Sequence, residues 1–127
     1  MSCYPLPLDA RSLKDGKMRM LLADFKFQSD KYKKTITAKT GFTYNGTSTP
    51  KQLWRWLGSP FYGLQRFGAV IHDWLYVNGW KIGISQKEAD GIFYEAMLCS
   101  GKNHFSAWLI YRGVRAFGKN SYLTGNE

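Results

Sequence analysis

The spacing of hydrophobic residues changes near Pro50, from a period of two before it to a period of about 3.6 after it. Alternating apolar and polar residues over 18–28 and 33–44 predict β-strands, and the polar residues 29–31 predict a turn between them. Helices are predicted in the second half. The expected fold class is therefore α+β, with a small N-terminal antiparallel β-sheet or hairpin followed by three to four packed helices.

Four helices are predicted after residue 48. The first is short, begins at Ser48 or Thr49 with Pro50 in its first turn, and ends near 58–60. The second covers 62–78. The third begins at Ser85, because Glu88 three residues later completes a capping box, and ends at Gly101. The fourth covers 103–117. The apolar stripes of the last three are Leu64, Phe67, Val70, Ile71, Trp74 and Leu75; then Ala89, Ile92, Phe93, Ala96 and Met97; then Trp108, Leu109, Tyr111 and Val114.

The chain contains no internal repeat and no linker that would divide it. We therefore expect one domain over 1–127, with an N-terminal extension at 1–17 and a C-terminal tail at 119–127. The longest apolar runs fall short of the roughly 18 residues that a membrane span requires. The N-terminus lacks the basic-then-apolar order of a secretory signal, so no standard export route is expected.

Two cysteines are present. Cys3 falls in the expected extension and Cys99 near the end of the third helix. A disulfide is possible, but two reduced thiols are the favoured interpretation, and a cysteine-based zinc site has too few ligands.

The formal net charge of +9 is unevenly distributed. No acidic residue lies between Asp30 and Asp73, so the basic residues of this interval create a positive electrostatic field. A field of this sign attracts nucleic acid, anionic lipid or an acidic protein face. No nucleic-acid-binding motif accompanies the charge, so specific nucleic-acid binding is not expected. The basic residues of this interval are Lys31, Lys33, Lys34, Lys39, Lys51, Arg55 and Arg66.

The most informative motif is His72-Asp73, with Tyr76 four residues after the histidine and Asp90 on the next predicted helix. If the two helices pack antiparallel, Asp90 can bind the His72 imidazole, fix its tautomer and raise its basicity, as in a general base acting on water. Asp73 points about 100° away on the helix, where it could bind a hard cation. A structural His–Asp bond between two helices explains the same residues, and spacing alone favours it.

A second constellation is the loop from Tyr44 to Pro50. Gly46 allows the backbone to turn, and its carbonyl groups could bind calcium. Ser48 could act as a nucleophile, although it lacks a Gly-x-Ser-x-Gly context. The alternative is a turn that leads into a capped helix. In the last helix, His104 is expected to be a capping or surface residue. The cations Arg112, Arg115 and Lys119 suit the helix dipole or a solvated face.

Three ordered segments carry a resemblance to a known family: GFTYNGTSTPKQLWRWLGSPF, AVIHDWLY and SQKEADGIFYEAM. They resemble the phage and prophage family of domain of unknown function 1353, over roughly residues 20–118. That family has Gly-Phe, Asp-Gly-Ala-Ser-x-Pro, a Trp-rich helix, His-Asp-x-x-Tyr and Ala-Asp-x-x-Phe. This chain departs from the pattern at Asn45, where the family usually has Asp.

The helical motifs are also similar to the phospholipase A2 core, especially the domain in parvovirus capsids. The resemblance implies that His72 is the general base, with Tyr76 and Asp90 orienting it. It also implies that Asp73 binds calcium together with the backbone of Tyr44 and Gly46, in a loop that includes Asn45, Thr47 and Ser48. The upstream loop lacks the second glycine of the phospholipases and lies farther from the histidine.

Two functional hypotheses follow. The first is a phage-encoded, calcium-dependent lipid hydrolase, a His/Asp metal-assisted enzyme that acts on anionic lipid of the host envelope. The second is a tail-associated virion protein or a host-interaction protein, whose His–Asp motif is structural and whose interface includes Trp54, Trp56 and Phe61. Either would be made in the host cytoplasm, and the second would place the protein in the virion.

Overall fold

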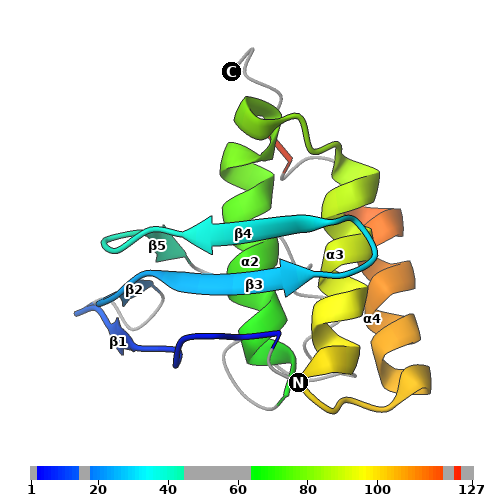
Figure 1. The fold of residues 1–127 in the computed structure, drawn as a ribbon, viewed down its shortest axis with the longest axis horizontal. Helices are drawn as coiled ribbons and strands as arrows, with labels where there is room; N and C mark the ends of the chain where they lie inside the picture. The colour runs from blue at the N-terminus through cyan, green and yellow to red at the C-terminus, as the bar shows by residue number, and fades with distance from the viewer. Residues whose placement is uncertain (1–2, 15–17, 45–63, 119–121, 124–127) are drawn as a thin grey trace.

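The computed structural model describes residues 3–14, 18–44, 64–118 and 122–123. Strands occupy the N-terminal part and helices the C-terminal part, which confirms the expected α+β class (Figure 1). The helix expected between Ser48 and residues 58–60 lies outside the described residues.

The strands form two small antiparallel sheets. Strands β1 (Ala10–Ser12), β2 (Arg19–Leu21) and β5 (Thr43–Tyr44) pair in the order β1-β2-β5. Strands β3 (Phe25–Ser29) and β4 (Lys34–Ala38) form a hairpin. The β-structure expected over 18–44 is therefore confirmed, as two sheets. Within the N-terminal extension expected at 1–17, residues 10–12 form the edge strand β1.

Alternate residues of the hairpin face the helices. Phe25 and Phe27 are buried on β3, and Ile36 pairs with Phe27 across the hairpin and is also buried. The turn is anchored to α3 by Glu95. Its Oε1 accepts from Ser29 Oγ at 2.5 Å, and its Oε2 accepts from the backbone N–H groups of Asp30 at 2.9 Å and Lys31 at 3.2 Å. The carboxylate thus fixes the hairpin to the helix.

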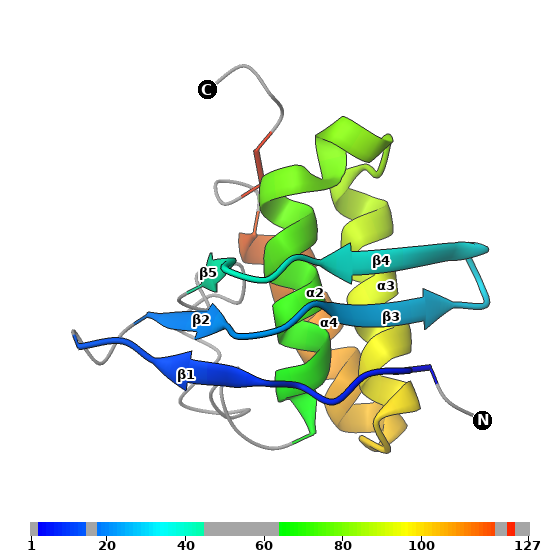
Figure 2. The same ribbon diagram turned by 60° about the vertical axis from the view of Figure 1, so that its left-hand side comes forward.

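The helices are α2 (Gln65–Asn78), the 3-10 helix η1 (Gly79–Ile82), α3 (Gln86–Cys99) and α4 (His104–Phe117). Helices α2 and α3 run antiparallel, with the β3–β4 hairpin across one side and α4 on the other side of α3 (Figures 1 and 2). This layering places the α2–α3 interface at the centre of the molecule. No described helix is long and apolar enough to span a membrane.

The helix boundaries follow their capping residues. Ser85 and Glu88 form the expected capping box, and Gly101 has a φ of +98°, which favours glycine after α3. Asn103 caps α4 through a bond from the Ser106 N–H at 2.8 Å. The stripe expected on α4 is only partly correct, because Trp108 is 46% exposed. The buried residues of α4 are Ala107, Ile110, Gly113 and Val114.

A glycine permits the close approach of α2 and α3. A Cβ at Gly68 would lie 3.0 Å from Phe93 Cδ1 and 3.1 Å from Ala96 Cβ. The absence of a side chain at Gly68 therefore admits α3 at this point. The apolar stripes of both helices are largely buried here, and this contact brings the polar residues beside them together.

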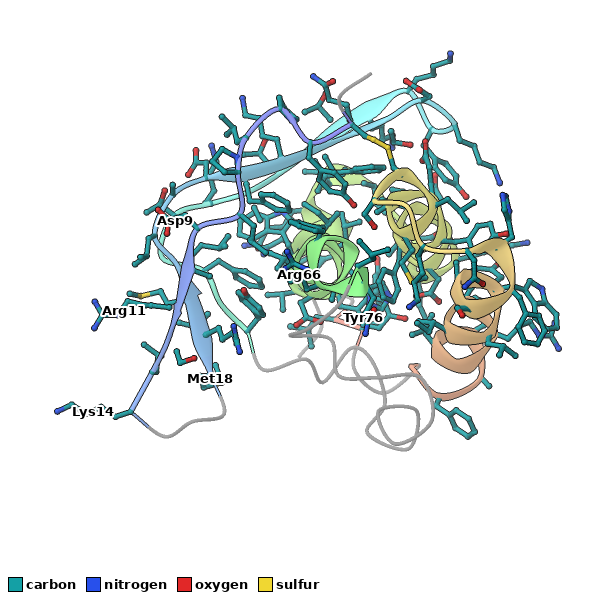
Figure 3. All side chains as sticks on the ribbon, turned by 90° about the horizontal axis from the view of Figure 1, so that it is seen from below. Asp9, Arg11, Lys14, Met18, Arg66 and Tyr76 are labelled. Carbon is teal, nitrogen blue, oxygen red and sulfur yellow. A yellow bond between two sulfur atoms is a disulfide. The ribbon has the colours of Figure 1, made fainter. Side chains whose placement is uncertain are left out.

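The N-terminal segment is joined to α3 by a disulfide between Cys3 and Cys99, whose Cα atoms lie 6.5 Å apart (Figure 3). The expectation of two reduced thiols was therefore wrong. The Cys3 carbonyl accepts from the Gln28 N–H at 2.8 Å, so the segment runs beside β3. Tyr4 stacks on Phe25 and donates to the Ala96 carbonyl at 2.7 Å. These contacts hold Cys3 at the end of α3.

Candidate functional site

The α2–α3 interface contains a buried histidine–aspartate pair. His72 of α2 and Asp90 of α3 are both 0% exposed, and His72 Nε2 lies 2.6 Å from Asp90 Oδ1. The His72–Asp90 bond that the sequence predicts for antiparallel helices is confirmed, and it is direct. His72 also stacks on Phe93, with ring centroids 4.5 Å apart, so one face of the imidazole is covered by an aromatic ring.

Asp90 receives two further donors. The Tyr76 hydroxyl donates to the same Oδ1 at 2.5 Å, and Arg115 donates to Oδ2 at 2.8 Å. Gln86 Nε2 reaches the Tyr76 oxygen at 3.4 Å. The carboxylate therefore joins three helices, α2, α3 and α4, through hydrogen bonds and one ion pair.

Arg115 is the member of this cluster that the sequence interpretation missed, since it was assigned to the helix dipole or a solvated face. A buried carboxylate requires a compensating charge, and α4 carries two candidates near its end, Arg112 and Arg115. The need of a buried carboxylate for a compensating charge was the signal in the sequence that pointed to an arginine partner for Asp90. It did not distinguish which arginine faces α3.

Burial fixes the protonation states of the donors. Burial lowers the pKa of His72, and the bond to Asp90 acts in the opposite direction. The imidazole is therefore neutral near neutral pH, with Nε2–H donating to Asp90 and Nδ1 as the acceptor nitrogen of this tautomer. Burial and the nearby charge of Asp90 raise the pKa of Tyr76, which remains a phenol and a donor.

The lowered pKa of His72 makes stability depend on pH. Because the unfolded chain binds a proton with a pKa near 6.5 and the native site resists it, acid favours unfolding. We expect the free energy of unfolding to fall as the pH goes from 7 to 5, by at most about 1.36 kcal/mol per pH unit for one proton. Urea unfolding at several pH values measures this. The slope should diminish in His72→Gln, and a rise in stability toward pH 5 would mean that the native imidazole is charged.

Asp73 lies on a different side of α2, next to the end of β5. It is 6% exposed. Burial first, and the negative charge of Asp73 in addition, raise the pKa of Tyr44 to about 12, while Arg19 acts in the opposite direction. The structure thus brings together two of the residues expected to hold metal, Asp73 and Tyr44.

The other expected loop and interface residues lie outside the described residues. These are Asn45, Gly46, Thr47, Ser48, Trp54, Trp56 and Phe61. Within the described parts of the chain, no group of three or more His, Cys, Asp or Glu side chains could hold a metal ion. His104 is exposed at the start of α4, with Asn103 as the cap, so it is a surface residue.

The described residues define an α+β domain whose central helices share a buried His–Asp–Tyr–Arg cluster. The chain belongs to the family described as "Protein of unknown function (DUF1353)", whose model matches residues 19–114. This confirms the family resemblance drawn from the motifs.

A curated relative is the "Uncharacterized protein y4iH" of Sinorhizobium fredii (strain NBRC 101917 / NGR234). The two are 33% identical over 125 residues, and the match covers 89% of this chain and 46% of the relative. The chain therefore spans about half the length of that relative. No solved structure matches the chain.

Proposed function

We propose that the protein is a hydrolase of lipid esters in which His72 is the general base. One observation carries the proposal: His72 Nε2 bonds Asp90 Oδ1 at 2.6 Å, and Tyr76 one helical turn later donates to the same oxygen. A neutral imidazole whose one nitrogen is fixed by a carboxylate is suited to remove a proton through the other nitrogen.

The chemistry assigned to these residues is ester hydrolysis. His72 Nδ1 takes a proton from water as the water oxygen bonds to the ester carbonyl carbon. The carbon–oxygen bond to the alcohol then breaks, and the proton on Nδ1 passes to the leaving oxygen, which gives a fatty acid and a lysolipid. Asp90 is a positioning residue that holds the tautomer, and Tyr76 and Arg115 hold Asp90.

The metal we propose for this chemistry is calcium, a hard cation that binds oxygen ligands. The described residues offer one buried carboxylate, Asp73, beside Tyr44, at the start of the segment whose carbonyl groups would complete the set. Such a donor set suits calcium better than zinc. When bound, calcium would supply positive charge for the ester carbonyl oxygen and a lipid phosphate.

The substrate class that we favour is anionic phospholipid of a host envelope. The net charge of +9 and the acid-free interval between Asp30 and Asp73 support this choice. Each basic residue near an anionic membrane surface contributes about 1 kcal/mol of attraction.

Purified protein with calcium should release fatty acid from phosphatidylglycerol vesicles. His72→Gln should lower the rate by about 10²–10⁴, the usual contribution of a positioned base, and Asp73→Asn should lower it by removing the charge that binds calcium. Calcium should also stabilise the wild type, by about 2.7 kcal/mol at a hundredfold excess over its Kd. Fatty-acid titration and thermal unfolding measure both effects.

The chain provides a matched control. His104→Gln changes the other histidine, which is exposed on α4, and should leave the rate unchanged. Circular dichroism establishes that each variant is folded. No product from several lipid classes, together with no calcium-dependent shift in Tm, would contradict the hydrolase proposal.

The second candidate is a non-enzymatic virion or host-interaction protein. It is favoured by the 0% exposure of His72 and Asp90 and by the ion pair from Arg115, which together suffice for a structural network. Helix α4 also exposes large apolar side chains, with Phe105 at 68%, Trp108 at 46% and Phe117 at 58%. In this case His72→Gln changes stability and leaves partner binding intact in a pull-down with other phage or host proteins.

A further inference from the structure

A cavity of about 400 Å³ lies between the β3–β4 turn and the helices α3 and α4. Its volume is within the usual range of small-molecule sites. Asp90 faces α2 and does not line the cavity, whereas the residues of α3 that do line it lie on another side of the helix: Lys87, Gly91, Tyr94, Glu95 and Leu98. The cavity is therefore separate from the His–Asp cluster. Its aromatic and basic lining is Tyr32, Tyr94, Tyr111, Trp108, Lys31 and Lys87.

Aromatic rings from three elements line this cavity. Tyr94 of α3 and Tyr111 of α4 have ring centroids 5.6 Å apart, and Tyr32 comes from the hairpin turn. Trp108 is 46% exposed, and the Arg112 guanidinium lies 5.7 Å from its ring centroid. Ring faces of this kind stack on flat, aromatic ligands.

The charge at the cavity favours an anion. Lys31 and Lys87 line it, with Glu95 as the acidic residue of the lining. Both Glu95 oxygens already accept hydrogen bonds, from Ser29 and from the backbone of the hairpin turn. The hairpin bonds thus hold the carboxylate against the turn, and the two lysine ammonium groups still outnumber it, which suits a phosphate.

The floor of the cavity is shaped by Gly91. A Cβ at this position would overlap the Tyr32 hydroxyl, so any larger residue would displace the ring. The glycine therefore lets Tyr32 lie against α3, with the ring forming one wall.

We propose that this cavity binds a nucleotide unit, with its base stacked among Trp108 and the tyrosine rings and its phosphate at Lys31 and Lys87. The aromatic walls favour a flat base over an acyl chain, and the tyrosine hydroxyls can bond the polar edges of a base. This is recognition by stacking and charge without sequence readout. A free nucleotide and one nucleotide of a single-stranded nucleic acid both present a flat base and a phosphate, so both fit this cavity.

Two probes separate these sources. Adenosine monophosphate tests the free nucleotide by isothermal titration, and a fluorescein-labelled ten-residue oligothymidylate tests the single strand by anisotropy. At least one should bind. Trp108→Leu should weaken that binding tenfold or more. Lys87→Gln should also weaken it. For the oligonucleotide, removing this lysine should reduce the salt slope by about 0.7, the contribution of one phosphate that a cation neutralises on a single strand.

The matched controls are Trp80→Leu and Lys81→Gln. Trp80 is 43% exposed on η1 with the Lys81 ammonium 5.7 Å from its ring centroid, outside this cavity. These variants should bind as the wild type does. Gly91→Ala gives an independent test, because it should displace Tyr32 and weaken binding.

Three results would overturn the proposal: neither probe binds, the Trp108 and Trp80 variants weaken binding equally, or Trp108→Leu reduces binding only to phosphatidylglycerol vesicles. The last result would make this face a membrane-contacting surface.

Discussion

Replacing Asp90 with alanine is expected to destabilise the protein by about 3 kcal/mol, the lower end of the cost of removing one partner from a buried ion pair, because the Arg115 side chain is 34% exposed. Loss of the hydrogen bond to His72 alone would predict about 1–3 kcal/mol. A figure at the top of this range follows because Arg115 and Tyr76 lose the same acceptor. Urea unfolding followed by circular dichroism measures the change.

Asp24→Ala is the control for this prediction. Asp24 is also a hydrogen-bonded carboxylate, but it lies at the surface, where it accepts from Thr40 and pairs with Lys39 at 3.9 Å. Its removal should cost far less stability than removal of Asp90, because solvent screens an exposed ion pair. A change within about 0.5 kcal/mol for Asp90→Ala would contradict the role assigned to the cluster in the fold.

Opening the Cys3–Cys99 disulfide is expected to have an effect of similar size. The two cysteines are 96 residues apart in sequence. Cross-linking a loop of about 100 residues lowers the entropy of the unfolded chain by an amount equivalent to about 4.7 kcal/mol at 25 °C. The double variant Cys3→Ala/Cys99→Ala should lower the free energy of unfolding by several kcal/mol.

A reductant distinguishes the covalent bond from the packing of the side chains. It should lower the Tm of the wild type and leave that of the double variant unchanged. Two titratable thiols in the unreduced, denatured wild type would show that the disulfide does not form in solution.

The helical half of the fold was readable from the sequence because its determinants are local. Ser85 and Glu88 define the start of α3 within four residues, and Gly101 defines its end. His72 and Tyr76 share a face by helical spacing, and Asp90 lies beside the stripe of the next helix. One assumption, antiparallel packing of α2 and α3, was then enough to bring the three together.

The features that the sequence did not reveal depend on contacts between distant segments. Arg115 reaches Asp90 across 25 positions, and Cys3 pairs with Cys99 across 96. Periodicity within one element carries no information on such partners. The orientation of α4 was misjudged for a related reason: Trp108 is apolar but faces outward, while Gly113 is buried.

The disulfide also determines the order of chain synthesis and cysteine oxidation. Cys3 leaves the ribosome before its partner Cys99, which follows 96 residues later, about 5–20 s at ordinary rates of elongation. During that time the Cys3 thiol belongs to a nascent chain without α3. The N-terminal segment can therefore be locked in place only after α2 and α3 have emerged, so oxidation follows synthesis of α3.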